Sequence, residues 1–254
     1  MDGRDAEARR EAAQQIADFG GAAEIEGYEI LSRLVPLTGK SALPEQFISR
    51  LESLNRIAEM TWQVAEPGFA LARAFHQAGR PFSISLNISA QMLDDDALLE
   101  RLSEKVAAHG LDPRQITLEI TESAAVDSRP GVLERLVHLR LRGFGLAIDD
   151  FGTGFSSLAQ LSKLPFTEMK IDRLFTSSVV SNPKARAVVE SSIHLARRLG
   201  MKTCAEGVDS EAVYRLMREL GADSFQGYHF HRPLPAREFT RWVQDWTITS
   251  ADRQ

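Results

Sequence analysis

Short runs of apolar and β-branched residues recur along this chain, and longer stretches with helical periodicity separate them. The runs that fit strands are 13–18, 28–31, 82–88, 116–121, 146–149, 168–171, 202–205 and 225–230. The stretches that fit helices are 44–77, 91–109, 131–142, 155–163, 183–199 and 210–220, and several of them stop at a glycine. Strands that alternate with helices imply parallel pairing through right-handed crossovers.

The number of strands favours a barrel over an open, doubly wound sheet. A (β/α)8 barrel typically needs about 250 residues, and this chain has 254. We therefore expect one domain over residues 13–246, with an extension over 1–12 and a frayed tail over 247–254. Run 13–18 is the poorest in β-branched residues, and stretch 44–77 contains Pro67, which predicts two helices there.

Net charge, cysteine content and the lack of long apolar runs exclude several classes of function. The net charge of −5 argues against a surface that binds long nucleic acids, which need a basic stripe, although it allows a small phosphate ligand whose charge is met by metals. Cys204 is the single cysteine, so we expect no internal disulfide and a cytoplasmic, reducing setting. No apolar run approaches the roughly 20 residues of a membrane span, and the charged N-terminus lacks the apolar core of a secretory signal.

Polar residues fall at the end or in the second half of each predicted strand after the first. They are Glu29, Asn87, Glu119, Asp149 with Asp150, Lys170, Glu206 and Gln226. In a barrel the carboxyl ends of all strands meet on one face, so these side chains are expected to converge. Any one of them alone is more often a helix cap, a turn residue or a salt-bridge partner, but seven such positions on seven successive strands favour a site.

The adjacent aspartates Asp149 and Asp150 repel each other, and burial raises that cost, which indicates a bound cation. Oxygen ligands of this type suit Mg²⁺ or Mn²⁺, and one aspartate can bridge two ions for in-line displacement at phosphorus. Lys170 can orient the attacking water or a phosphate oxygen, and the planar fork of Arg33 can grip a phosphate. His229 and His231 form an H-x-H pair, but no third nitrogen or sulfur ligand accompanies them.

The strings "GYEILSR", "LNIS", "LEITES", "IDDFGTGFSSL", "MKID", "AEGV" and "QGYHF" closely resemble the EAL-domain family over about residues 14–242. These are cyclic di-GMP-specific phosphodiesterases of bacterial second-messenger signalling and their relatives. The resemblance implies a modified (β/α)8 TIM barrel whose first strand is antiparallel to the rest. It also implies two Mg²⁺ or Mn²⁺ ions, hydrolysis of cyclic di-GMP to linear 5'-pGpG, and a homodimer.

The resemblance also implies a role for each matching residue. Glu29, Asn87, Glu119 and Asp149 correspond to the ligands of one metal, and Asp149, Asp150 and Glu206 to those of the second. Lys170 and Glu206 correspond to the residues that orient and activate the water, with Glu206 either a general base or chiefly a ligand. Gln226 corresponds to a supporting residue, Leu31 and Arg33 to substrate contacts, and Glu122 to the glutamate that steadies the "DFGTG" loop.

The chain departs from the family pattern at a few positions: the signature tripeptide reads E-I-L, and Leu34 and Asp209 replace an aromatic residue and a glutamate. The complete acidic set favours an enzyme. The alternatives are a catalytically weak or inactive receptor for cyclic di-GMP and a protein-interaction module. A receptor would be expected to have lost some of the acids, and an interaction module gives no reason for convergent carboxylates.

Overall fold

The computed structural model describes the backbone of residues 6–19, 22–36, 44–125, 131–154 and 158–251. Within these ranges, the side chains of residues 6–19, 22–23, 33–36, 44–46, 158 and 247–251 are not described. None of the helices in the described part of the chain combines the length and the apolar character that a membrane span requires.

Seven parallel strands follow one another around the sheet in chain order. They are β2 (Ala22–Pro36), β3 (Ser83–Asn87), β4 (Ile116–Thr121), β5 (Gly145–Phe151), β6 (Glu168–Ile171), β7 (Lys202–Ala205) and β8 (Ser224–Phe225). Strand β1 (Ala6–Phe19) pairs antiparallel with both β2 and β8, so it links the two ends of the run and closes the sheet. A short strand, β9 (Leu234–Pro235), pairs with β1. The result is the mixed α/β, TIM-barrel-like fold that the alternating pattern predicts.

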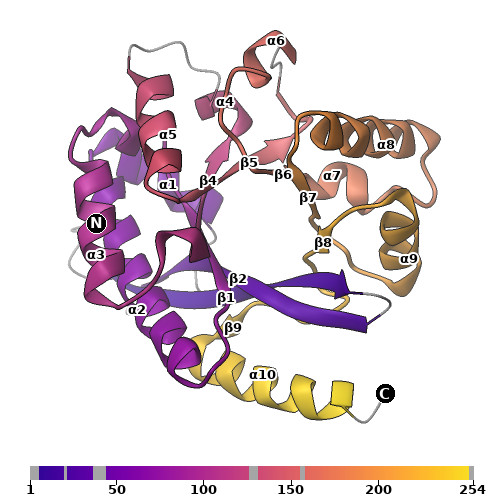
Figure 1. Ribbon diagram of the computed structural model, residues 1–254, viewed down its shortest axis with the longest axis horizontal. Coiled ribbons are helices and arrows are strands. Elements are labelled where there is room, and N and C mark those ends of the chain that lie inside the picture. Colours follow the sequence, from indigo (N-terminus) through magenta and orange to yellow (C-terminus); the bar gives the residue numbers. More distant parts are fainter. Residues whose placement is uncertain (1–5, 20–21, 37–43, 126–130, 155–157, 252–254) are drawn as a thin grey trace.

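Helices surround the sheet (Figure 1). They are α1 (Pro44–Ser53), α2 (Ile57–Gln77), α3 (Leu98–Ala108), α4 (Glu122–Ala125), α5 (Val132–Leu141), α6 (Leu158–Leu161), α7 (Arg173–Thr176), α8 (Pro183–Arg198), α9 (Glu211–Leu220) and α10 (Ala236–Ala251), with 3₁₀ turns at Met92–Asp94 and Pro113–Gln115. Helix α8 has Asn182 as its N-cap and Pro183 in its first turn, and α9 ends at Gly221 in the left-handed conformation.

The packing of β2 against α2 fixes the strand that carries Glu29. The fully buried hydroxyl of Tyr28 donates a hydrogen bond to the carbonyl of Gly68 on α2 at 3.0 Å. A Cβ at Gly68 would lie only 2.0 Å from the Cδ1 atom of Ile30, so a larger residue there would require the Ile30 side chain to move. The ring of Tyr28 also packs on Phe239 of α10, 5.1 Å between centroids.

The position of one break between helices and the end of one strand differ from the sequence prediction. Stretch 44–77 does form two helices, but the break lies at Leu54–Arg56, where Asn55 has a φ of 52°, and Pro67 lies inside α2. The predicted strand 225–230 is wrong beyond Phe225, because the chain turns there. A Cβ at Gly227 would lie 2.1 Å from the carbonyl oxygen of Val208, which shows how closely the turn approaches the loop after β7.

The ends of the chain carry more regular structure than expected. Strand β1 begins at Ala6, within the segment predicted to precede the domain. Helix α10 was not predicted, and it runs to Ala251, so its backbone includes the first residues of the tail expected from residue 247. The short helices α4 and α7 were also missed, because each spans only four residues.

Candidate active site

The predicted polar residues lie in the parallel strands or directly after them. Glu29 lies in β2, Asn87 ends β3, Glu119 lies in β4, Asp149 and Asp150 lie in β5, Lys170 lies in β6, and Glu206 and Gln226 directly follow β7 and β8. The strand register sets neighbours side by side: Asn87 pairs with Glu119 in the ladder between β3 and β4. The barrel therefore brings these side chains to one face, as the alternating pattern predicts.

Lys170 is the most buried cation of the site. Its ammonium donates to the carboxylates of Glu119 at 2.7 Å and Glu206 at 2.7 Å, and lies 3.4 Å from Glu29 and 3.6 Å from Asp149. Burial disfavours the charged amine, but the four carboxylates outweigh it and hold the pKa of Lys170 well above its ordinary value. Lys170 is therefore a charged residue of the barrel interior, not a snorkelling surface lysine.

Glu29 is held by donors from three other strands. Its two carboxylate oxygens accept hydrogen bonds from the amides of Asn87 at 2.6 Å and Gln226 at 2.8 Å, in addition to the contact with Lys170. Burial favours the neutral acid, but the charge of Lys170 and the two amide donors prevail and lower the pKa of Glu29. Glu29 is therefore an ionised carboxylate in a fixed orientation.

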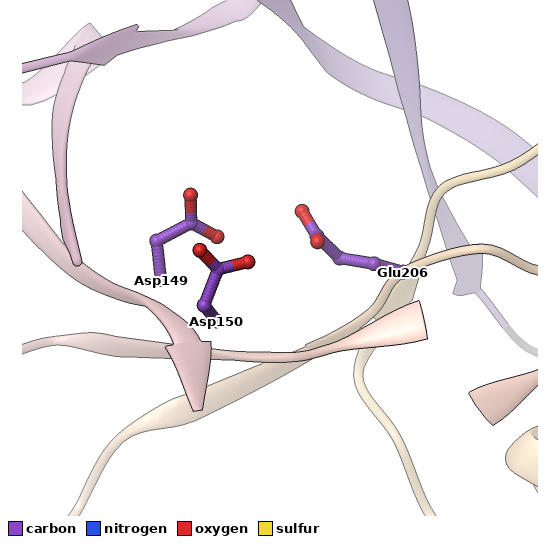
Figure 2. A group of neighbouring side chains, drawn as sticks. All are labelled: Asp149, Asp150 and Glu206. Atoms are coloured by element: carbon purple, nitrogen blue, oxygen red, sulfur yellow. The ribbon is translucent and has the colours of Figure 1, made fainter. Parts of the chain in front are cut away.

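Asp149, Asp150 and Glu206 form a group that fits a metal ion. One carboxylate oxygen from each lies within 4.8 Å of the others, and Figure 2 shows the three side chains directed toward a common space. The Oδ1 atom of Asp149 is buried and accepts no hydrogen bond; the ammonium of Lys170 lies 3.6 Å away, too far for one, so a bound cation would offset the cost of its burial. The donor set is all oxygen, as Mg²⁺, Mn²⁺ and Ca²⁺ prefer.

Burial and neighbouring negative charges raise the pKa values of two carboxylates of the site. Burial, with the charges of Asp149 and Glu29, raises the pKa of Glu206 to about 8, although Lys170 opposes the shift. Burial and the charge of Glu29 also raise the pKa of Glu119 well above its ordinary value. Both shifts arise chiefly from burial, and the charges of neighbouring carboxylates add to it.

Asp172 lies beside the group of Asp149, Asp150 and Glu206, and the sequence did not predict a role for it. Burial, the charge of Asp149 and then the charge of Asp172 raise the pKa of Asp150 to about 6. Asp172 also caps α7 by accepting a hydrogen bond from the N–H of Leu174 at 2.7 Å. Its signal was its position two residues after Lys170 in "MKID", since alternate residues of a strand share a face.

The loop after the aspartate pair is fixed by Glu122. Asp150 has a φ of 55°, so the chain leaves β5 in a conformation that few residues other than glycine adopt. The buried Glu122 carboxylate then accepts hydrogen bonds from the N–H groups of Gly152 at 3.0 Å and Gly154 at 3.3 Å. These contacts join the end of β4 to the turn beside the metal-binding group.

Other candidates lie apart from this cluster or outside the described side chains. Leu31 is half-buried in β2, and the side chain of Arg33 is not described. His229 and His231 lie in or after a turn and not on a strand; His229 pairs with Glu211 at 3.2 Å, and His231 contacts the carbonyl of Arg232. The two histidines therefore have partners other than each other, and Cys204 is buried in β7.

Comparison with known proteins identifies the family. The EAL domain profile matches residues 14–233, most of the chain. The chain belongs to the EAL domain family. It is 37% identical over 196 residues to the cyclic di-GMP phosphodiesterase RocR of Pseudomonas aeruginosa, covering 77% of this chain and 50% of RocR. It is 35% identical over 227 residues to the oxygen sensor protein DosP of Escherichia coli, covering 89% of this chain and 28% of DosP.

Solved EAL structures share the fold. The PaMucR phosphodiesterase in complex with c-di-GMP superposes with a TM-score of 0.86 at 31% identity, covering 91% of this chain and 94% of that one. The chain spans about half the length of RocR and 28% of DosP, so these relatives contain further segments that it does not match.

Proposed function

We propose that this EAL domain is a metal-dependent phosphodiesterase that hydrolyses cyclic di-GMP to linear 5'-pGpG. The observation that carries the proposal is the convergence of Glu29, Asn87, Glu119, the Asp149–Asp150 pair, Lys170, Glu206 and Gln226 on one face of the barrel. The substrate follows from the relatives, since RocR is named a cyclic di-GMP phosphodiesterase and the PaMucR phosphodiesterase was solved with c-di-GMP.

The carboxylates and the Asn87 amide form two overlapping sets that would hold two Mg²⁺ or Mn²⁺ ions. Glu29, Asn87, Glu119 and Asp149 would hold one ion, and Asp149, Asp150 and Glu206 the other. When bound, the ions would offset the negative charge of the phosphodiester and lower the pKa of the attacking water. Asp149, the residue common to both sets, has a buried Oδ1 atom that accepts no hydrogen bond, which supports this assignment.

The remaining roles follow from the contacts. Glu206 lies in the proposed metal-binding group, where its carboxylate would be close enough to a bound water to take a proton from it. Lys170 contacts Glu206 at 2.7 Å, so its ammonium is placed to orient that water or a phosphate oxygen. Gln226 fixes Glu29, while Leu31 and Arg33 on the same strand as Glu29 would contact the substrate.

We also propose a homodimer, with the Glu122-bound loop linking subunit contact to metal binding. Phe175 of α7 packs beside Gly152 of this loop, and the adjacent Leu174 of α7 is 63% exposed. Light scattering of Leu174→Glu against the unchanged chain tests the assembly, because a buried apolar contact would not tolerate the new charge.

Turnover tests the activity directly. The purified chain is incubated with cyclic di-GMP and Mg²⁺ or Mn²⁺, and the products are separated by chromatography. We expect pGpG from the unchanged chain, none from Glu29→Ala or Glu206→Ala, and unchanged turnover from Glu190→Ala, an exposed glutamate of α8 paired with Arg186. No pGpG in Mg²⁺ or Mn²⁺, together with tight binding of cyclic di-GMP in Ca²⁺ or EDTA, would instead indicate a receptor.

A further inference from the structure

The ammonium of Lys170 contacts carboxylates from both proposed metal sets. Its partners are Glu119, Glu206, Glu29 and Asp149, at 2.7 Å, 2.7 Å, 3.4 Å and 3.6 Å. The lysine side chain is 3% exposed, so water does not screen these contacts. Of the residues whose side chains are described, no other cation forms an ion pair with these four carboxylates.

One positive charge among several buried carboxylates has two opposing effects. Without it the carboxylates would repel one another, and their buried charges would have no counter-ion. When Lys170 is present, carboxylate oxygens of Glu29 and Glu119 accept hydrogen bonds from its ammonium and are not available to a divalent ion. The positive ammonium also repels that ion. The same contacts therefore stabilise the metal-free barrel and oppose metal binding.

We propose that Lys170 is the resident counter-cation of the metal-free site and that divalent ions compete with its ammonium for the same carboxylate oxygens. This inference rests on the proposed metal site and adds a second role for Lys170, which acts before substrate or water is present. In the metal-free chain Lys170 holds the carboxylates of β2, β4 and β5 together with Glu206 after β7. The same ammonium lowers the affinity of the site for divalent metal ions.

Lys170→Met separates this role from the orientation of water, because metal binding is measured without nucleotide. Methionine fills the volume of the aliphatic stem but carries no charge. We expect a lower unfolding temperature than the unchanged chain in EDTA, and Mg²⁺ and Mn²⁺ dissociation constants about tenfold lower by titration calorimetry. Lys202→Met is the matched control, since Lys202 on β7 pairs with Glu26 at 2.9 Å and is 66% exposed; it should leave both values unchanged.

A second variant keeps the test decisive if Lys170→Met does not fold without metal. Lys170→Met/Glu119→Gln removes the positive charge together with its 2.7 Å partner, which restores the charge balance. The double variant should fold in EDTA. If it fails to fold as well, charge compensation is not the role of Lys170, and the proposal is overturned.

The outcomes separate this inference from the proposed function. If the unchanged chain binds metal and Lys170→Met binds it with equal or weaker affinity, only the counter-cation role is wrong. If the unchanged chain binds neither Mg²⁺ nor Mn²⁺, the proposed metal site is wrong, and this inference fails with it. A larger gain in unfolding temperature on adding Mn²⁺ to Lys170→Met than to the unchanged chain supports the competition.

Discussion

The Glu122 carboxylate accepts a hydrogen bond from the backbone N–H of Gly152 at 3.0 Å, across a separation of 30 positions in the chain. Glu122 begins α4 directly after β4, and Gly152 opens the turn that follows Asp150. A single buried acid therefore ties the ends of two neighbouring strands together beside the proposed metal site. The bond reaches a charged acceptor, which makes it stronger than a neutral hydrogen bond.

Replacing Glu122 with alanine is expected to loosen this turn. The change leaves the N–H groups of Gly152 and Gly154 without their acceptor, and should lower the free energy of unfolding by about 2–3 kcal/mol. Metal affinity should fall as well, because Asp150 is fixed by the same turn. Urea denaturation and titration calorimetry measure the two effects. Glu134→Ala, at an exposed site on α5, is the control, and equal stability of the two variants would contradict the prediction.

Gly152 should tolerate no side chain. Its φ is 99°, and a Cβ would lie 2.9 Å from the Cε2 atom of Phe175. Gly79 has a φ of 75° but nothing within 4 Å, so Gly79→Ala reports backbone strain alone, about 1 kcal/mol. Gly152→Ala should cost clearly more by chemical denaturation and should reduce phosphodiesterase turnover, whereas Gly79→Ala should retain it. If Gly152→Ala were as stable as Gly79→Ala, the Phe175 ring would move aside at no cost, and the prediction would be wrong.

The elements best predicted from the sequence are those whose limits are set by local pattern. Strands β4, β6 and β7 have the bounds expected from their apolar runs. Strand β8 was overestimated because "FQGYHF" has the composition of a strand, while its end is imposed by contact between Gly227 and Val208, 19 positions earlier in the chain. No local pattern reports such a contact.

Some features of the site follow from the sequence, and others depend on contacts between distant residues. That the polar strand ends would meet follows from barrel geometry and needs no coordinates. That Lys170 would contact four carboxylates depends on the register of β6 against its neighbours and on the reach of each side chain. Asp172 was missed for a related reason: its proximity to Asp150 arises where the ladder between β5 and β6 shifts register, after Ile148.

Gly227→Ala should disturb the site from the β8 side. The added Cβ would lie 2.1 Å from the oxygen and 2.4 Å from the nitrogen of Val208, so backbone must move. Gln226, whose amide holds Glu29, would move with it. We expect a loss of about 2–3 kcal/mol in unfolding free energy and weaker metal binding by calorimetry. Gly110→Ala, where a Cβ meets nothing within 4 Å, should leave metal binding intact. Native-like metal affinity in Gly227→Ala would exclude this coupling.

The stability of the metal-free chain should fall as the pH rises from about 5 to about 8. Folding raises the pKa of Glu206 from 4.5 to about 8 and that of Asp150 from 3.8 to about 6. Between these values the folded chain binds more protons than the unfolded chain, so each increase in pH favours unfolding. Unfolding temperatures measured in EDTA across this range check the slope, which should be shallower in Glu206→Gln. Saturating Mg²⁺ should remove the slope or reverse it, because metal binds the ionised carboxylates. A metal-free chain that grows more stable over this range would contradict the raised pKa values.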